Sequence, residues 1–427
     1  MIGIGLGSNL GDRLENLRQA IWKLIFSSVI EPPIRFSSLV QSKAVVPDSS
    51  PESWSKLDFL NAVVIAQTSL GPRDLLKALL KVEAEMGRIR REKWAPRVVD
   101  LDLLFYDNEK IQESDLCLPH PAWSERAFVL EPLRELGWEP AQQRPSMKAC
   151  QRLPKKLLPC ELVGVVNLTP DSFSDGGQFE RPDQVIDRVE TLVQEGAGVI
   201  DLGAESTRPG AQALSDEEEY SRLESILGAL VESKSQYPWL RWSLDSRKSE
   251  VWKRANELFP FNLCNDVSGG EDLELLRLAA ERDCPVVLMH HLGIPVDRRR
   301  QLDASRSAVD QVLEWGVQKR DSLRQQFKNL RLIFDPGIGF GKSAEQSVEL
   351  IQSIRKFQSL EMPLFVGHSR KSFLNLISHQ DFASRDLESA VISGFLAKEG
   401  ASYLRVHTPG FSQRAIETQF LFSARQL

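Results

Sequence analysis

Cysteine is scarce in this chain, which has five cysteines among 427 residues. The count is odd, and no pair shows the C-x-x-C spacing of a redox or zinc motif (Cys117, Cys150, Cys160, Cys264 and Cys284). These features disfavour a disulfide framework and a cysteine-based metal site. We therefore expect reduced thiols, which are typical of a cytoplasmic protein.

Long hydrophobic runs and a large net charge are also missing. No apolar stretch approaches the ~18 residues of a membrane-spanning helix, and the N-terminus lacks the basic and apolar regions of a signal peptide. The net charge of −6 gives no overall attraction for nucleic acid or for an anionic membrane. The sequence thus predicts a cytoplasmic protein that acts on small molecules, with no nucleic acid and no membrane as partner.

The chain is long enough for two domains, and its first third differs in pattern from the rest. There, the apolar residues predict the order βαββαβ, which is typical of a ferredoxin-like α+β sandwich. We assign residues 1–150 to this domain and the proline-bearing residues 151–160 to a linker. The expected strands are 2–6, 34–40, 59–68 and 97–106, and the expected helices are 14–26 and 72–86.

Residues 161–427 repeat a different pattern, in which an apolar segment ends on a polar residue and a helical stretch follows. The pattern occurs eight times, beginning with Val163–Leu168, which carries Asn167 at its end. Eight such units describe an α/β TIM barrel, (β/α)₈, with its active site at the carboxyl ends of the strands. The other expected strands are 199–203, 242–244, 262–264, 285–289, 331–334, 363–367 and 403–406.

Charged residues concentrate in one segment of the first domain, between residues 87 and 104. Asp100 and Asp102 are two positions apart on an expected strand, so both carboxylates lie on one face. Two such oxygen donors suit Mg²⁺, which takes substrate phosphates and water as its other ligands. A pair of aspartates alone is also typical of a salt-bridged surface, but the neighbouring cations favour a site for a metal-bound polyphosphate. These cations are Arg88, Arg90, Arg91, Lys93 and Arg97.

The polar residues at the ends of the barrel strands form two chemical groups. Hydrogen-bond acceptors suit a flat heterocycle with adjacent N–H donors, such as an aminopyrimidinone edge. Cations and a histidine suit a leaving phosphate group. The acceptors are Asp201, Asp245, Asn265 and Asp335, and the cationic group is Arg208, Lys342, Arg370, Lys371, Arg405 and His407.

The first domain resembles the 6-hydroxymethyl-7,8-dihydropterin pyrophosphokinase family. The resemblance rests on K-x-A-P-R-x-x-D-L-D-L-L at Lys93–Leu104, and on Gly7–Asp12, Phe59–Ala62 and Pro119-His120. It implies transfer of pyrophosphate from ATP to the pterin hydroxymethyl group, with Asp100 and Asp102 holding two Mg²⁺ ions. The implied phosphate- and ATP-binding residues are Arg88, Lys93, Arg97 and His120, of which Arg88 and Arg97 are also catalytic. The implied pterin site consists of Phe59, Asn61 and Phe128, supported by Glu83.

The second domain resembles the dihydropteroate synthase family. The matching runs are NLTPDSFSDGG, ESTRPGA, NDVSGG, DPGIGFGK, SRKS and RVH. The family joins the pyrophosphorylated pterin to 4-aminobenzoate with loss of pyrophosphate. The resemblance implies pterin binding by Asp245, Asn265, Met289, Asp335 and Lys371, with Asp335 and Lys371 also catalytic. It further implies one Mg²⁺ on Asn167, pyrophosphate binding by Arg208, Arg405 and His407, and an aminobenzoate pocket of Phe173, Thr207, Pro209, Phe340 and Ser372.

The sequence departs from the family pattern directly after His407, where Thr408 stands in place of a frequent acidic residue. An alternative for this half is a folate-dependent methyltransferase, which shares the pterin barrel. Ser369-Arg370-Lys371 and Thr207–Gly210 favour the synthase, as does the kinase ahead of it, whose product the synthase consumes. A second alternative is that one half is a non-catalytic scaffold. The sequence also leaves open a homodimer formed through the barrel.

Overall fold

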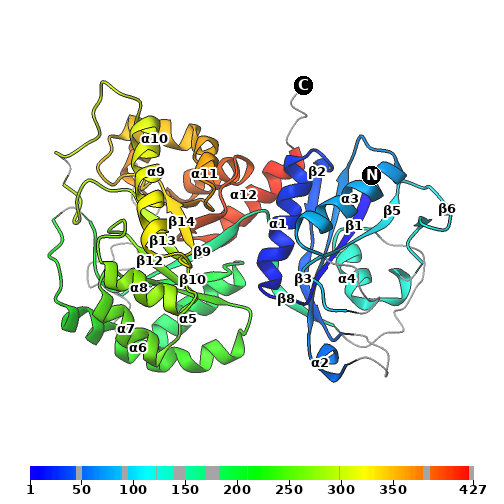
Figure 1. The fold of residues 1–427 in the computed structure, drawn as a ribbon, viewed down its shortest axis with the longest axis horizontal. Helices are drawn as coiled ribbons and strands as arrows, with labels where there is room; N and C mark the ends of the chain where they lie inside the picture. Colours follow the sequence, from blue (N-terminus) through cyan, green and yellow to red (C-terminus); the bar gives the residue numbers. More distant parts are fainter. Residues whose placement is uncertain are drawn as a thin grey trace. The chain divides into compact units, whose positions relative to one another are not determined.

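The computed structural model is shown in Figure 1. It describes residues 1–44, 51–88, 95–121, 123–138, 150–168, 182–208, 210–297, 299–377 and 385–422. The chain divides into two compact units, the first consisting of Met1–Pro159 with Glu417–Leu427 and the second of Cys160–Ile416. Within the described residues, no helix combines the length and apolar character needed to cross a bilayer.

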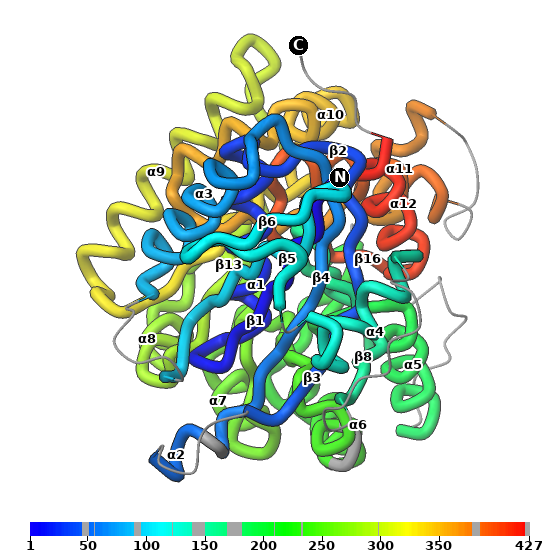
Figure 2. The backbone as a smooth tube through the Cα atoms, turned by 90° about the vertical axis from the view of Figure 1, so that its right-hand side faces the viewer, coloured from blue at the N-terminus to red at the C-terminus, as the bar shows by residue number. Residues whose placement is uncertain are grey.

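The first unit is the expected α+β domain, built on an antiparallel sheet that can be followed in Figure 2. The strand order is β5-β1-β4-β3-β8, and β2 also pairs with β4. Helix α1 packs on β1, α3 on β5 and α4 on β4. The strands of this sheet are β1 (Ile2–Ser8), β2 (Glu31–Phe36), β3 (Ser38–Ser42), β4 (Phe59–Gln67), β5 (Asp100–Tyr106) and β8 (Gln151–Lys156). The helices are α1 (Arg13–Phe26), α2 (Glu52–Ser55), α3 (Pro72–Glu85) and α4 (Ala127–Glu135), and β6 (Ile111–Gln112) pairs with β7 (Cys117–Leu118).

Strand β8 lies in the segment that the sequence analysis assigned to a linker. It pairs antiparallel with β3, with Val40 opposite Arg152 and Gln41 opposite Gln151. Pro154 within this strand made the segment resemble a linker, but an edge strand tolerates proline because one side of its backbone is unpaired. The segment is therefore an ordered part of the first unit's sheet.

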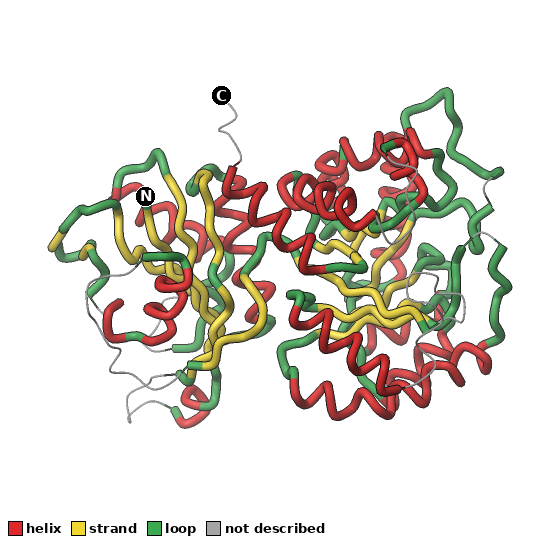
Figure 3. Tube along the Cα trace, turned by 180° about the vertical axis from the view of Figure 1, so that it is seen from behind, coloured by secondary structure: helices red, strands yellow, loops and turns green. Residues whose placement is uncertain are grey.

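The second unit is a parallel barrel of eight strands, as expected, surrounded by helices (Figure 3). The strand order is β14-β13-β12-β11-β10-β9-β16-β15, and a parallel bridge between Phe334 and Leu364 joins the two ends of this order. The strands are β9 (Glu161–Asn167), β10 (Val199–Gly203), β11 (Arg241–Asp245), β12 (Leu263–Asp266), β13 (Val286–Met289), β14 (Leu332–Asp335), β15 (Phe365–Gly367) and β16 (Tyr403–Val406). The helices are α5 (Pro182–Gln194), α6 (Asp216–Gln236), α7 (Ser249–Leu258), α8 (Leu273–Glu281), α9 (Ala308–Gln326), α10 (Ala344–Gln352) and α11 (Asp386–Lys398). Helix α12 (Pro409–Phe422) begins in this unit, and its residues from Glu417 onward belong to the first unit.

The interior of the barrel is apolar below the carboxyl ends of its strands. One buried cluster takes a side chain from each of seven strands: Val163, Val199, Leu263, Val287, Ile333, Phe365 and Tyr403. Above it, Asn167 pairs in register with Gly203, Gly203 with Asp245, and Asp245 with Asn265. Parallel pairing thus brings polar residues from separate strands to one level of the barrel.

Candidate active sites

The two aspartates of β5 lie beside two glycines of the central strand β1. Gly7 pairs with Asp100, and Gly5 pairs with Asp102. Gly7 also pairs with Asn61 on its other side. A Cβ atom at Gly7 would lie 3.2 Å from the Asn61 Oδ1 and 3.9 Å from the Asp100 Cβ. Because Gly7 has no side chain, space remains between Asn61 and Asp100, and we call this surface at Gly7 the glycine floor. The alternating glycines of the sequence did not predict this role.

Two arginines hold Asp100, whereas the sequence analysis assigned both of them to substrate phosphates. The Arg88 Nη1 lies 2.5 Å from Asp100 Oδ1, and the Arg97 Nη1 lies 2.7 Å from Asp100 Oδ2. Arg88 also pairs with the buried Glu83, whose Oε1 accepts a hydrogen bond from the Leu101 amide at 2.8 Å. The site thus places two guanidinium groups at the edge of the carboxylate pair, where they can also meet phosphate oxygens.

Asp102 lacks such a close cation in the ion pairs of the described residues. The nearest one recorded is the Arg126 Nη1, 3.7 Å from its Oδ2. Burial, followed by the Asp100 charge, raises the pKa of Asp102 to about 7. A cation between the two carboxylates would relieve this electrostatic cost. Among the described residues no group of three or more His, Cys, Asp or Glu could hold a metal, so an ion here would need oxygen ligands from substrate or water, which suits Mg²⁺.

The other predicted residues of the first site lie around this pair. The Asn61 Nδ2 donates to the Ser42 Oγ at 3.0 Å, and the Phe59 ring lies 5.8 Å from the Arg97 Cζ. These two residues therefore border the arginines and aspartates. Arg126, which the sequence analysis did not single out, connects the remaining predicted residues to the site.

Arg126 faces Asp102 on one side and the predicted aromatic residue on the other. Its Cζ lies 5.9 Å from the ring of Phe128, which also packs on the core beneath α4. Burial, with the Arg126 charge next, lowers the pKa of His120. Phe128 and His120 thus lie near Arg126, which in turn faces Asp102. Lys93 lies outside the described residues.

In the barrel, Arg405 of β16 joins carboxylates from two other strands. Its Nε donates to Asp201 Oδ2 at 2.6 Å, and its Nη2 donates to Asp245 Oδ2 at 2.8 Å. The Asn265 Nδ2 donates to the same Asp201 oxygen at 3.0 Å. The sequence analysis expected Arg405 to meet pyrophosphate, whereas here it pairs with two acceptors of the proposed heterocycle site. Burial is the main reason that the pKa of Asp245 rises to about 7.

A second polar group completes the opposite part of the ring. Asp335 pairs in register with Met289, and its Oδ1 accepts a hydrogen bond from the Gly337 amide at 2.7 Å. The Lys371 Nζ donates to the Ile338 carbonyl and lies 4.7 Å from the centre of the Phe340 ring. Burial raises the pKa of Asp335, with the Lys371 charge opposing. Burial also lowers the pKa of Lys371 to about 8, and the charge of Asp335 opposes this shift.

His407 lies among arginines. Its backbone amide donates to the Ser369 Oγ at 3.3 Å, and its Nδ1 lies 3.1 Å from the same oxygen. The Arg188 Nη2 of α5 donates to the His407 carbonyl at 2.5 Å, a contact that the sequence pattern did not suggest. Burial is the main cause that lowers the pKa of His407, which favours its neutral imidazole. Four cationic side chains add to this effect: Arg370, Arg405, Arg188 and Arg208. Such a concentration of positive charge suits an anion.

Those remaining predicted residues that the structure describes lie at the ends of strands or in the segments that follow them. The Thr207 carbonyl accepts a hydrogen bond from the Val296 amide at 3.3 Å, so the loops after β10 and β13 are in contact. Asn167 ends β9 and is partly exposed, and Ser372 is exposed directly after Lys371. Phe173 and Pro209 lie outside the described residues.

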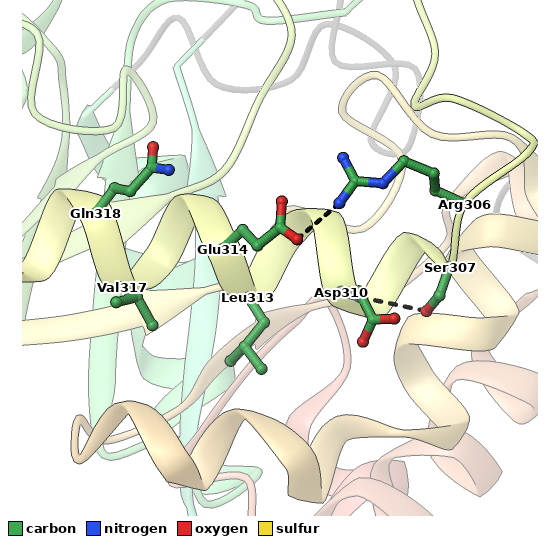
Figure 4. A pocket seen from close by; sticks show the side chains of 7 residues that line it. All are labelled: Arg306, Ser307, Asp310, Leu313, Glu314, Val317 and Gln318. Atoms are coloured by element: carbon green, nitrogen blue, oxygen red, sulfur yellow. Dashed lines mark hydrogen bonds and ion pairs between the residues drawn. The ribbon is translucent and has the colours of Figure 1, made fainter.

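A surface pocket of about 580 Å³ lies along α9 (Figure 4). An ion pair of 2.7 Å between Arg306 and Glu314 lies at its edge. It shares no lining residue with either group of predicted site residues and therefore plays no part in the assignment below. Its lining consists of Arg306, Ser307, Asp310, Leu313, Glu314, Val317 and Gln318.

Two family models match the chain. Residues 3–137 match 7,8-dihydro-6-hydroxymethylpterin-pyrophosphokinase, and residues 163–407 match the pterin binding enzyme family. The folate synthesis bifunctional protein of Chlamydia caviae is 35% identical over an alignment of 442 positions, gaps included, that covers 97% of this chain and 96% of the relative. The mitochondrial folate synthesis bifunctional protein of Arabidopsis thaliana is 33% identical over an alignment of 454 positions that covers 95% of this chain and 80% of the relative.

Solved structures match the barrel. Dihydropteroate synthase of Anaplasma phagocytophilum, with bound 6-hydroxymethylpterin-monophosphate, is 31% identical with a TM-score of 0.54 and covers 62% of this chain and 99% of that one. Dihydropteroate synthase of Xanthomonas albilineans with 4-aminobenzoic acid is also 31% identical with a TM-score of 0.54, and the match covers 63% of this chain and 93% of that one.

Proposed function

Because the chain belongs to the folate synthesis bifunctional proteins, with a hydroxymethyldihydropterin pyrophosphokinase followed by a dihydropteroate synthase, we propose how its residues divide the two reactions. The comparisons do not favour a methyltransferase or a non-catalytic half. Both families are generally Mg²⁺-dependent. We assign two Mg²⁺ ions to the kinase site, on Asp100 and Asp102, and one to the synthase site, on Asn167.

In the kinase reaction, pyrophosphate passes from ATP to the hydroxymethyl oxygen of the pterin. Asp100 and Asp102 would hold Mg²⁺, which would neutralise charge on the triphosphate. Arg88 and Arg97 contact Asp100, and their guanidinium N–H groups also bind the oxygens of the transferred phosphates. The pterin stacks between aromatic rings above the glycine floor, and ATP binds beside it. The residues assigned are Phe59, Asn61 and Phe128 for the pterin, and Lys93 and His120 for ATP.

In the synthase reaction, the bond between the pterin methylene carbon and the pyrophosphate oxygen breaks first. Pyrophosphate leaves with the bonding electrons, toward the arginines around His407. The electron-rich pterin stabilises the methylene cation, with the Asp335 carboxylate adding to that stabilisation. The neutral amine of 4-aminobenzoate then attacks and releases its proton to solvent, so no protein nucleophile is required.

The pterin in this site meets carboxylates on one side and the Lys371 ammonium on the other. Asp245, Asn265, Asp335 and Lys371 form its polar edge, and Met289 lines the pocket. Arg405 serves both halves of the substrate, because it holds Asp245 at 2.8 Å and also contributes positive charge at His407. Arg208 and His407 complete the pyrophosphate site, and the aminobenzoate pocket is assigned to Phe173, Thr207, Pro209, Phe340 and Ser372.

The observation that carries the synthase assignment is the acceptor ring of β10, β11 and β12, which Arg405 joins two residues before His407, whose carbonyl accepts a hydrogen bond from Arg188. The two groups match the two halves of a pterin pyrophosphate, one a hydrogen-bonding heterocycle and the other an anion.

A homodimer through the barrel has support in exposed apolar side chains. Leu387 and Val391 lie one turn apart on α11 and are 71% and 63% exposed, and Phe411 of α12 is 49% exposed. Exposed apolar residues of this kind favour contact between copies of a chain. Light scattering of wild-type protein and of Val391→Lys would test the dimer, and an unchanged mass would contradict it.

We place both reactions in the cytoplasm, in line with the five free cysteines.

Mass-spectrometric product analysis tests the two reactions together. The protein is incubated with ATP, Mg²⁺, 6-hydroxymethyl-7,8-dihydropterin and 4-aminobenzoate, and we expect AMP and 7,8-dihydropteroate. Without ATP no dihydropteroate should form, but supply of the pyrophosphorylated pterin should restore it. Formation of AMP without dihydropteroate in the first mixture, together with no dihydropteroate from the supplied pyrophosphorylated pterin, would contradict the synthase assignment.

A further inference from the structure

The loop after β15 carries residues of both halves of the synthase site. Ser369 contacts His407, and Lys371 lies near Asp335. The residue between them, Arg370, directs its side chain toward α11 and has a left-handed backbone with φ of 58°. This conformation is unfavourable for a residue with a side chain, so contacts of Arg370 must hold it.

Asp386, in the first turn of α11, provides the main side-chain contact of this kind. Its Oδ1 lies 2.6 Å from the Arg370 Nε and its Oδ2 lies 2.8 Å from the Nη2, a two-point ion pair. Both side chains are largely buried, with exposures of 18% and 10%. The Arg370 backbone amide also donates to the Ser389 Oγ of α11 at 3.0 Å. A planar guanidinium held at two points has a defined orientation.

The same carboxylate also reaches the residue after His407. The Thr408 Oγ1 donates to Asp386 Oδ2 at 2.8 Å and lies 3.5 Å from the Arg370 Nη2. Position 408 is the one at which the sequence departs from the frequent acidic residue. In this structure Asp386 of α11 supplies a carboxylate beside Arg370.

We propose that Asp386 is a positioning residue of the synthase, which fixes Lys371 and His407 together through Arg370 and Thr408. The proposal rests on the roles assigned above to Lys371 and His407. Asp386 itself contacts no substrate. Its carboxylate fixes the pterin-binding and pyrophosphate-binding halves of the site relative to each other.

Asp386→Asn tests this role, because the amide keeps the size but loses the charge-assisted pair. We expect the synthase kcat with pyrophosphorylated pterin to fall by about 10–100-fold, with KM for 4-aminobenzoate nearly unchanged. Kinase activity of the same preparation should stay at the wild-type level. Asp310→Asn is the matched control, since Asp310 is an exposed aspartate in the first turn of α9.

Thr408→Asp in the Asp386→Asn protein provides the decisive comparison. A carboxylate at position 408 lies within reach of Arg370 and should restore kcat to within about threefold of wild type, which loss of general stability would not allow. Unchanged kinetics of Asp386→Asn, or a loss that Thr408→Asp does not relieve, would overturn the proposal. A wild-type protein that forms no dihydropteroate would instead overturn the proposed function.

Discussion

Each of the two sites contains an arginine that joins a buried carboxylate to a more exposed one. In the kinase site Arg88 joins Glu83, 2% exposed, to Asp100, 23% exposed. In the barrel Arg405 joins Asp201, 0% exposed, to Asp245, 17% exposed. The chemistry is the same, but Arg88 lies 12 residues from its more distant partner, whereas Arg405 lies 160 and 204 residues from its partners.

This difference shows how the two sites depend on the rest of the fold. The kinase cluster lies within one helix, one loop and one strand, and Asp100 has Arg97 as a second cation. The barrel cluster needs three strands in their correct register. We therefore expect the barrel site to be more sensitive to loss of its arginine, while the kinase site depends more on an added cation.

Loss of the bridging arginine should give the largest effect. Arg405→Met leaves the fully buried Asp201 without its cation, which should destabilise the barrel by about 3–5 kcal/mol and abolish dihydropteroate formation. Arg88→Met should destabilise the first unit less, because Asp100 keeps Arg97 and Glu83 keeps the Leu101 amide. Denaturant unfolding of both variants measures the difference. Equal losses of stability would remove the contrast between the sites.

Asp102→Asn should separate catalysis from stability in the kinase site. We expect pyrophosphate transfer to fall by about 10²–10³-fold, while the synthase step continues. Burial and the Asp100 charge raise the pKa of Asp102 to about 7 from 3.8, so its ionisation lowers stability as pH rises through that interval. Asparagine has no such penalty.

Without Mg²⁺, the melting temperature of Asp102→Asn relative to wild type should therefore be higher at about pH 8 than at about pH 5. Added Mg²⁺ should reduce this advantage by stabilising the wild type. A difference in melting temperature that does not vary with pH would contradict the electrostatic account.

Lys371→Met should lower the synthase rate by about 10²-fold and leave the kinase unchanged. Burial lowers the pKa of Lys371 to about 8, and only the ammonium form carries the positive charge that strengthens its hydrogen bond to the pterin. The wild-type kcat/KM should therefore fall above about pH 8, and Lys371→Arg should move this decline to higher pH. The same alkaline decline in Lys371→Met would assign it to another group.

Gly7→Ala should give the smallest effect of this series. The added methyl group would lie 3.2 Å from the Asn61 Oδ1 and 3.6 Å from the Phe59 Cδ1, so it should displace the pterin edge and raise KM for the pterin by about tenfold. Gly71→Ala is the matched control, because a Cβ there meets nothing within 4 Å. Equal KM values for the two variants would show that the glycine floor does not matter.

The sequence was most informative where a short segment holds the chemistry. The alternation of residues placed Asp100 and Asp102 on one face, and the basic cluster indicated that cations lie near them. The ion pairs of Arg88 and Arg97 with Asp100 became visible only in the structure. Arg126 and Arg188 were missed, since each is an ordinary surface residue of a helix or its start until the helix packs. The β8 segment was also misread, because its prolines resemble those of a linker.

The sequence by itself determined both fold classes and the polar residue at the end of each barrel strand, because apolar periodicity and strand boundaries are local properties. Tertiary structure decided which of those residues meet. The pairing of β16 with β9, and of β9 with β10, brings Arg405 to Asp201. Helix α11 likewise brings Asp386 to Arg370. No local preference encodes such pairs, because each depends on strand register and helix packing between distant segments.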